Sequence, residues 1–141
     1  MTTLTNSESF LNPMGPEAKF TQWLKKTLKA KADIQRIEVI TAQGVPDCNI
    51  AIKGRPGNIW VELKALKYVK LRKEQYAFGM KRTMLFDDTV YLWNGYNKVI
   101  QIWPFPFEAK PAGKDHLKPT TKPLYEVSYD YFKEDFDLTR L

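Results

Sequence analysis

Asp47, Glu62 and Lys64 interrupt two apolar alternating runs in the stretch GVPDCNIAIKGRPGNIWVELK, which runs from Gly44 to Lys64 around a Gly-Arg-Pro-Gly turn. Asp47 precedes the first apolar run, and Glu62 and Lys64 lie at the end of the second run. Two carboxylates held close together repel each other unless a proton or a cation neutralises them. Oxygen ligands with water completing the shell suit Mg²⁺ or Mn²⁺ better than zinc. These residue types therefore indicate a divalent-metal site with a lysine beside it, as suits hydrolysis of a phosphate ester.

Alternation of side chains across two strands places these charges on one face of a hairpin. We expect CNIAIK and NIWVELKA to be strands, with a loop at 54–57. In this register Asn49 faces Glu62 and Asp47 faces Lys64, so Asp47 and Glu62 are diagonal neighbours, roughly 7–8 Å apart. A shift of the strand register by two residues keeps the polar and apolar side chains on separate faces. A shift by one residue would bury the charged side chains. The other, apolar face carries Cys48, Ile50, Ile52, Ile59, Val61 and Leu63.

Structural explanations also exist for these residues. Pro46-Asp47 is common turn chemistry, and Glu62 with Lys64 could form an ordinary salt bridge on the solvent side of an edge strand. The turn explanation leaves Glu62 unexplained. A metal platform explains all three charges together, and the backbone carbonyl of Leu63 offers it a further oxygen ligand.

Pro46-Asp47 followed by Glu62-Leu63-Lys64 resembles the motif of the PD-(D/E)-x-K nuclease superfamily. With an acid in a preceding helix and a glutamine in a following one, residues 16–103 look like the VRR-NUC branch and related phage or archaeal Holliday-junction resolvase-type enzymes. The resemblance implies a restriction-endonuclease-like core of order α-β-β-β-α-β, and a Mg²⁺-dependent (or Mn²⁺-dependent) endonuclease that cleaves DNA, selectively at branched structures. A departure is Gln43, where many relatives have an arginine.

The resemblance also implies a role for each site residue. Lys64 positions or deprotonates the attacking water, and Gln75 supports the site. Glu17 is a second-metal or outer-shell ligand, although an acid in a first helical turn is also favoured by the helix dipole. The implied catalytic set is Glu17, Asp47, Glu62, Lys64 and Gln75. The implied metal ligands are Asp47, Glu62, the Leu63 backbone carbonyl and Glu17.

The wider pattern predicts an α/β fold with a central mixed β-sheet flanked by helices. Apolar periodicity indicates helices at 16–31 and 69–85. Strands are expected at 34–41, with Ile37, Val39 and Thr41 on one face, and at 89–94 and 98–103, with Asn94-Gly95 as the turn between the last two. The expected organisation is a flexible N-terminal arm (1–15), a nuclease core (16–105), and a Pro/Lys-rich linker with an acidic aromatic C-terminal extension (106–141).

Size and composition limit the alternatives. The 141 residues suit one domain. The sequence contains no run of about 18 apolar residues, so a membrane span is not expected. The N-terminus lacks the pattern of a secretory signal. Cys48 is the single cysteine, so an intramolecular disulfide and a zinc cluster are not expected. We expect Cys48 to fill the core, and the protein to act in the cytoplasm, encoded by a phage or mobile element.

A net charge of +6, concentrated in the body of the chain, indicates a polyanionic partner, and DNA is the expected one. The alternative is a merely solvated basic surface. His116 is expected to be an exposed loop residue. The expected DNA-contacting residues are Lys67, Lys70, Arg72, Lys73, Lys81 and Arg82.

Aromatic residues beyond the core lead us to expect a homodimer. Trp103, Phe105 and Phe107 are too apolar to leave in water, and the tail holds further aromatics, the residue type favoured at interfaces. The alternative is that these side chains pack on their own domain. For function, the alternatives to a branched-DNA endonuclease are an exonuclease or nicking enzyme on ordinary DNA, and a non-catalytic DNA-binding module with the same fold.

Overall fold

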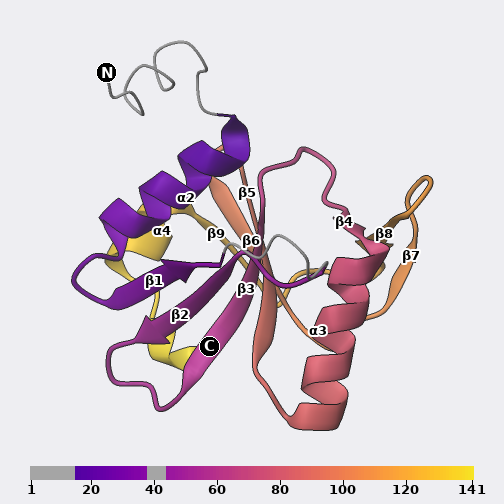
Figure 1. Ribbon diagram of the computed structural model, residues 1–141. Coiled ribbons are helices and arrows are strands. Elements are labelled where there is room, and N and C mark those ends of the chain that lie inside the picture. Colours follow the sequence, from indigo (N-terminus) through magenta and orange to yellow (C-terminus); the bar gives the residue numbers. More distant parts are fainter. Residues whose placement is uncertain (1–14, 38–43) are drawn as a thin grey trace, which may run out of the picture.

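A six-stranded mixed sheet is the centre of the molecule (Figure 1). The computed structural model describes residues 15–37 and 44–141. The strand order is β1-β2-β3-β5-β6-β9; β3 and β5 are parallel, and the other neighbours are antiparallel. This confirms the predicted central mixed sheet. The strands are β1 (Ala32–Arg36), β2 (Cys48–Ile52), β3 (Asn58–Lys64), β5 (Val90–Tyr96), β6 (Val99–Pro104) and β9 (Tyr125–Ser128).

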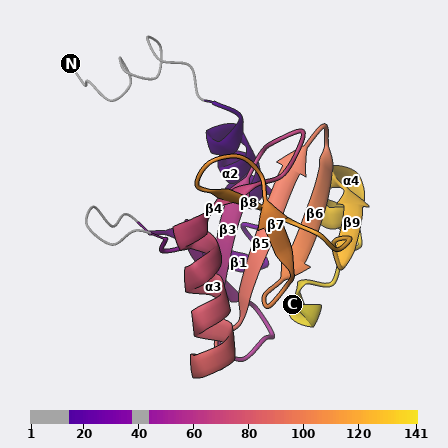
Figure 2. The same ribbon diagram turned by 90° about the vertical axis from the view of Figure 1, so that its right-hand side faces the viewer.

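Helices cover both faces of the sheet, because its central strands are apolar on both sides. Helices α2 (Pro16–Thr27) and α4 (Tyr129–Glu134) lie on one face, and α3 (Lys73–Phe86), the crossover between β3 and β5, lies on the other (Figure 1). Figure 2 shows α3 on one side of the strands and α4 on the other. Tyr91 and Trp93 point to the α2 side, and Val90 and Leu92 belong to the cluster on the α3 side. A short 3₁₀ helix, η1 (Leu138–Arg140), follows α4. None of the helices in the described part of the chain is long and apolar enough to cross a bilayer.

The hairpin keeps the predicted faces but not the predicted register. All six residues of the predicted apolar face are buried. The ladder pairs Cys48 with Val61 and Ile50 with Ile59, two residues away from the prediction. The loop is longer than expected because Gly54 and Gly57 both adopt positive φ (85° and 74°). Continuing this ladder by one residue places Asp47 opposite Glu62, instead of opposite Lys64.

Residues predicted to be linker instead form part of a second, three-stranded sheet, of order β4-β8-β7. It consists of β4 (Leu71–Arg72), β8 (His116–Pro119) and β7 (Ala109–Pro111). Ala109 and Leu117 pack against the apolar cluster on the α3 side, which explains why this proline-rich segment is ordered as strands. The prediction of an exposed His116 loop was therefore wrong: the residue is half-buried in β8. The helix predicted to begin at 69 begins at Lys73, because residues 71 and 72 pair with β8.

The turn predicted at Asn94-Gly95 lies three residues further on. Asn97 and Lys98 have φ of 51° and 59° and connect β5 to β6 as a two-residue hairpin turn. Gly95 lies within β5, where a Cβ atom would overlap the ring of Phe20, so the glycine makes room for α2. Helix α2 ends at Thr27 and β1 at Arg36, both earlier than predicted. The predictions for Val39, Thr41 and Gln43 lie outside the described residues.

The aromatic residues after β6 belong to the protein's own core. Trp103, Phe105 and Phe107 are 4%, 6% and 8% exposed and pack with residues of α3, so the expectation that they need a partner was wrong. Phe132 and Phe136 of the tail are likewise buried on the α2 side of the sheet. The predicted core role of Cys48 is confirmed, because its side chain is fully buried.

Candidate active site

Glu62 is a buried carboxylate at the centre of the candidate site. It lies on β3 with 3% of its surface exposed, on the face that α3 covers. Its Oε2 accepts a hydrogen bond from Gln75 Nε2 (2.6 Å) and lies 3.4 Å from Lys64 Nζ. Its Oε1 is buried and has no hydrogen-bond partner among the described residues. Because a buried oxygen without a partner is costly, this atom is positioned for a ligand.

Asp47 is held beside Glu62 by the end of the hairpin. Its Oδ2 accepts a hydrogen bond from the backbone N–H of Leu63 (2.9 Å), and its backbone carbonyl accepts one from Ile37 N–H (2.7 Å). The first bond connects β2 to β3 through a side chain just where the ladder ends. The structure thus brings together the two carboxylates that the sequence predicted to be neighbours.

The charge state of Glu62 depends on its burial and on the neighbouring Asp47. Burial, followed by the negative charge of Asp47, raises the pKa of Glu62 to about 8, although Lys64 partly offsets the shift. Without a cation, Glu62 therefore carries a proton at neutral pH. A bound divalent cation would favour the ionised carboxylate instead.

Glu17 reaches the same region from the first turn of α2. Burial and the charge of Asp47 raise the pKa of Glu17, whereas Lys64 and Arg36 lower it. Sequence reasoning missed Arg36, at the end of β1, because its proximity to Glu17 depends on how α2 packs on the sheet. Within residues 15–37 and 44–141, no three His, Cys, Asp or Glu side chains converge as a ready metal cluster. Glu17 is therefore near the pair of carboxylates rather than part of a three-carboxylate cage.

Gln75 connects the start of α3 to the carboxylate. Its Oε1 accepts a hydrogen bond from the backbone N–H of Arg72 (2.8 Å), while its Nε2 donates to Glu62. Gln75 is 8% exposed, and it occupies the third helical position, where a side chain can cap the free N–H groups. One side chain therefore both starts the helix and orients Glu62.

Asn94 supports the backbone that follows Lys64. This asparagine, 1% exposed, accepts a hydrogen bond from Leu66 N–H (3.0 Å) and donates one to the Leu66 carbonyl (2.9 Å). Asn94 pairs with Lys64 in the parallel ladder between β3 and β5. Sequence reasoning missed it because Asn-Gly suggested a turn, and no local signal shows that a strand asparagine bonds to a distant loop.

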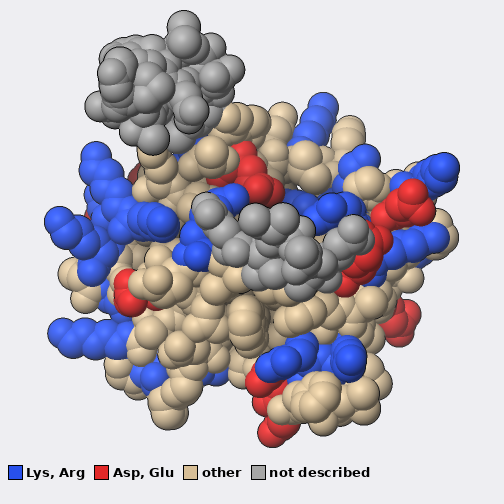
Figure 3. All heavy atoms as spheres, in the orientation of Figure 1, with Lys and Arg blue, Asp and Glu red and all other residues tan. Residues whose placement is uncertain are grey.

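The predicted DNA-contacting residues separate into two groups. Lys67, Lys70, Arg72 and Lys73 are exposed and lie in the segment between β3 and the first turn of α3, the turn that carries Gln75. Lys81 and Arg82 lie near the opposite end of α3. Arg82 also forms an ion pair with Asp88 (2.5 Å), so it has a structural partner. Figure 3, in the orientation of Figure 1, shows lysine and arginine side chains on two sides of the molecule, over α2 and around β4 and β8.

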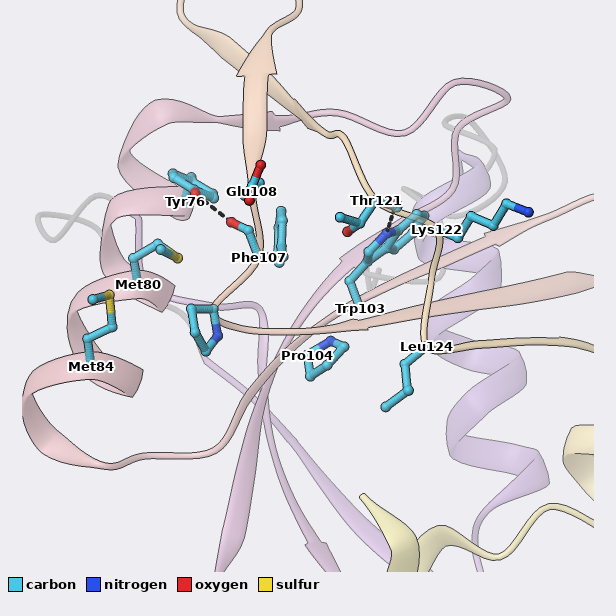
Figure 4. A pocket seen from close by; sticks show the side chains of 11 residues that line it. Tyr76, Met80, Met84, Trp103, Pro104, Phe107, Glu108, Thr121, Lys122 and Leu124 are labelled. Atoms are coloured by element: carbon cyan, nitrogen blue, oxygen red, sulfur yellow. Dashed lines mark hydrogen bonds between the residues drawn. The ribbon is translucent and has the colours of Figure 1, made fainter.

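A separate groove of about 570 Å³ lies between α3 and the segment after β6 (Figure 4). Its lining is mostly apolar, with Met80, Met84 and Trp103 among its residues. Tyr76 donates a hydrogen bond across one side to the Phe107 carbonyl (2.6 Å). None of the site residues described above lines this groove, so it is distinct from the candidate active site.

Comparisons with known proteins bear on the fold. No known family's sequence profile matches the chain, and no curated protein matches it. A solved structure of Hjc, a Holliday junction resolvase from the archaeal hyperthermophile Archaeoglobus fulgidus, is similar, with a TM-score of 0.56 and 12% sequence identity. The match covers 87% of this chain and 99% of that chain. It confirms the predicted fold class, a mixed sheet flanked by helices as in that nuclease.

Proposed function

We propose that this protein is a divalent-metal-dependent endonuclease that hydrolyses phosphodiester bonds in DNA, selectively in branched DNA such as a four-way junction. The observation that carries the proposal is Glu62. It is a buried carboxylate with one free oxygen, beside Asp47 and Lys64. A buried cluster of this kind is unfavourable for stability by itself, and strongly perturbed carboxylates in such settings favour a functional role. The shared fold with a Holliday junction resolvase supports the choice of substrate.

The residues fit Mg²⁺ or Mn²⁺. Asp47 and the free Oε1 of Glu62 would be the side-chain ligands, with the Leu63 backbone carbonyl as a third oxygen and water completing the shell. Glu17 would act in the outer shell or on a second ion. A cation bound there would polarise the phosphate and lower the pKa of a bound water.

Lys64 is the residue that we assign to the attacking water. Its Nζ is 3.4 Å from Glu62 Oε2, and its side chain is 17% exposed, so it meets both the carboxylate and the solvent. From this position the ammonium group can orient a water molecule and stabilise negative charge that develops on the phosphate. Gln75 keeps Glu62 Oε2 occupied, which leaves Oε1 for the metal.

Binding to DNA is assigned to the basic residues around the site. Lys67, Lys70, Arg72 and Lys73 would contact phosphates without reading sequence. Lys81 and Arg82 remain candidates at the far end of α3. Because each neutralised phosphate releases counterions, affinity should fall steeply as salt rises.

We further propose a homodimer acting in the cytoplasm. Cutting two strands of a symmetric junction needs two sites, and a two-fold pair of chains supplies them. The aromatic residues 103–107 no longer support this idea, since they are buried within one chain. Light scattering on the full chain, with and without a junction, tests whether the protein is a dimer.

A VRR-NUC relationship and a phage origin also stay predictions.

A metal titration with several substrates tests the proposed function. Labelled duplex, flap and four-way junction DNA are incubated with the protein and Mg²⁺, Mn²⁺ or EDTA, and the products are sized on denaturing gels. We expect internal cuts in the junction that need the metal. Release of single nucleotides from ends would indicate an exonuclease, and cuts in plain duplex alone would indicate a nicking enzyme. DNA binding without cleavage under any metal would indicate a non-catalytic module.

A further inference from the structure

One face of the second sheet is basic across all three strands. Residues opposite each other in neighbouring strands point to the same face. The register pairs Arg72 with His116, and Lys118 with Lys110. Because alternate residues of a strand share a face, His116 and Lys118 lie on the same side of β8. The row Arg72, His116, Lys118 and Lys110 therefore crosses the sheet from β4 to β7, and we call it the basic row.

The opposite face of this sheet is apolar and explains why the basic row faces outward. Leu71 is fully buried, and Leu117 and Ala109 pack against the core cluster on the α3 side. Arg72, Lys110 and Lys118 are exposed. The small sheet thus covers the end of the core with one face and presents its charges to solvent with the other.

Lys110 and Lys118 form a like-charge pair that the fold leaves unneutralised. They are direct cross-strand partners, and such pairs are destabilising. Within the described part of the chain, neither lysine forms an ion pair. Two lysines in cross-strand register without an ion-pair partner are unfavourable for folding. The same arrangement suits binding to the phosphates of a nucleic-acid backbone.

The basic row is connected to the candidate active site by two hydrogen bonds. Arg72 N–H donates to Gln75 Oε1, and Gln75 Nε2 donates to Glu62. On the other side, Lys73 N–H donates to the Asp115 carbonyl (3.1 Å) and holds the β7–β8 hairpin to the start of α3. Figure 1 shows β4, β7 and β8 together beside that end of α3.

We propose that the basic row binds the sugar-phosphate backbone of a duplex arm that leaves the cleavage site. This proposal rests on the proposed function, and it adds a second contact surface on a segment whose sequence suggests only a linker. Adjacent strands are about 4.8 Å apart, and Lys118 lies two residues beyond His116 along β8, so the row spans roughly 12 Å. That length corresponds to about three phosphates of one DNA strand, at about 3.4 Å of axial rise each. The contact is with phosphates, so it carries no sequence preference.

The test replaces the two facing lysines in the double variant Lys110→Gln/Lys118→Gln. A matched control, Lys53→Gln/Lys133→Gln, removes the same charge from two exposed lysines on the β2–β3 loop and α4. Affinity for a duplex-armed junction is measured by fluorescence anisotropy from 50 to 300 mM salt. The slope of log affinity against log salt should become less steep by about 1.8, which corresponds to two phosphate contacts. This change weakens binding by up to about 60-fold at 0.1 M salt.

Two further readouts separate this inference from a folding defect and from the proposed function. The melting temperature of the double variant should stay the same or rise, because a repulsive pair is removed. Its cleavage rate at saturating DNA should match the wild type. If the double variant Lys110→Gln/Lys118→Gln and the control variant have equal slopes of log affinity against log salt, the inference is overturned, even if the protein cleaves junctions. A protein that never cleaves but shows the reduced slope would overturn the proposed function and leave the basic row standing.

Discussion

Glu62→Gln should make the metal-free protein more stable at high pH while abolishing cleavage. The variant keeps the shape of the side chain and an oxygen that can accept the Gln75 hydrogen bond, but it removes the titrating group. In the wild type, burial and Asp47 raise the pKa of Glu62 from 4.5 to about 8. Between these two pH values the unfolded chain is ionised at this residue and the folded chain is protonated.

The sign and size of the effect follow from this difference. Because the folded state binds the extra proton, the free energy of unfolding falls as pH rises, by about 1.4 kcal/mol per pH unit. The loss begins at the unfolded pKa, near 4.5, and ends at the folded pKa, near 8. From pH 5 to pH 8.5 it amounts to about 4 kcal/mol, since the group is almost completely buried. At about 3 °C per kcal/mol, this corresponds to roughly 12 °C in melting temperature.

The assay is thermal and denaturant unfolding in EDTA at several pH values between 5 and 8.5. The wild type should lose stability over this range, and Glu62→Gln should lose about 4 kcal/mol less. The exposed Glu126→Gln serves as the control and should follow the wild type. Millimolar Mg²⁺ should flatten the wild-type curve, because the cation favours the ionised carboxylate. Equal pH slopes for the wild type and Glu62→Gln would refute the reasoning about this site.

Two further predictions concern positions that the fold depends on. Gln75→Leu leaves Glu62 and the Arg72 N–H without their partner, so we expect a loss of about 1–3 kcal/mol in unfolding free energy and slow cleavage. Gln101→Leu removes an exposed bond to Glu126 and a longer one from Asn94 (3.3 Å), and it should cost much less, because Asn94 keeps its two bonds to Leu66. Equal costs for the two leucine variants would contradict the role assigned to Gln75. Gly95→Ala places a methyl group against the Phe20 ring and should destabilise the protein by about 1–3 kcal/mol. Gly15→Ala meets no atom within 4 Å and should change the melting temperature little, so similar values for the two alanine variants would argue against the close packing of α2 on β5.

Strong local patterns predicted the central part of the fold. Side chains alternate between the two faces of β3, so the sequence determines the face on which Glu62 lies. A register shift of two residues leaves every side chain of the hairpin on the same face. The sequence therefore predicted which side chains share the site, although it placed Asp47 opposite Lys64 instead of Glu62. The register error arose from the loop between the two strands, where Gly54 and Gly57 have positive φ and the loop is two residues longer than predicted, a change that no hydrophobic pattern records.

Non-local contacts account for what the sequence did not predict. Gly95 is required by the ring of Phe20, which is distant in sequence, and Asn94 bonds to the loop after Lys64. The second sheet depends on Leu117 packing against the core and on pairing with two residues of β4. A proline-rich segment with few apolar residues shows no strand periodicity, so its role as a structural element, and the basic row that it carries, becomes visible only in the fold.

Single-turnover cleavage of a labelled four-way junction by the wild type, Asp47→Ala and Lys64→Ala tests the central claim most directly. The reactions contain saturating protein and Mg²⁺, and anisotropy on the same samples reports binding. We predict metal-dependent internal cuts by the wild type, no detectable cleavage by either variant, and DNA affinity that is largely unchanged, because the basic residues around the site supply the binding. Cleavage by either variant at the wild-type rate would contradict the assignment of this site.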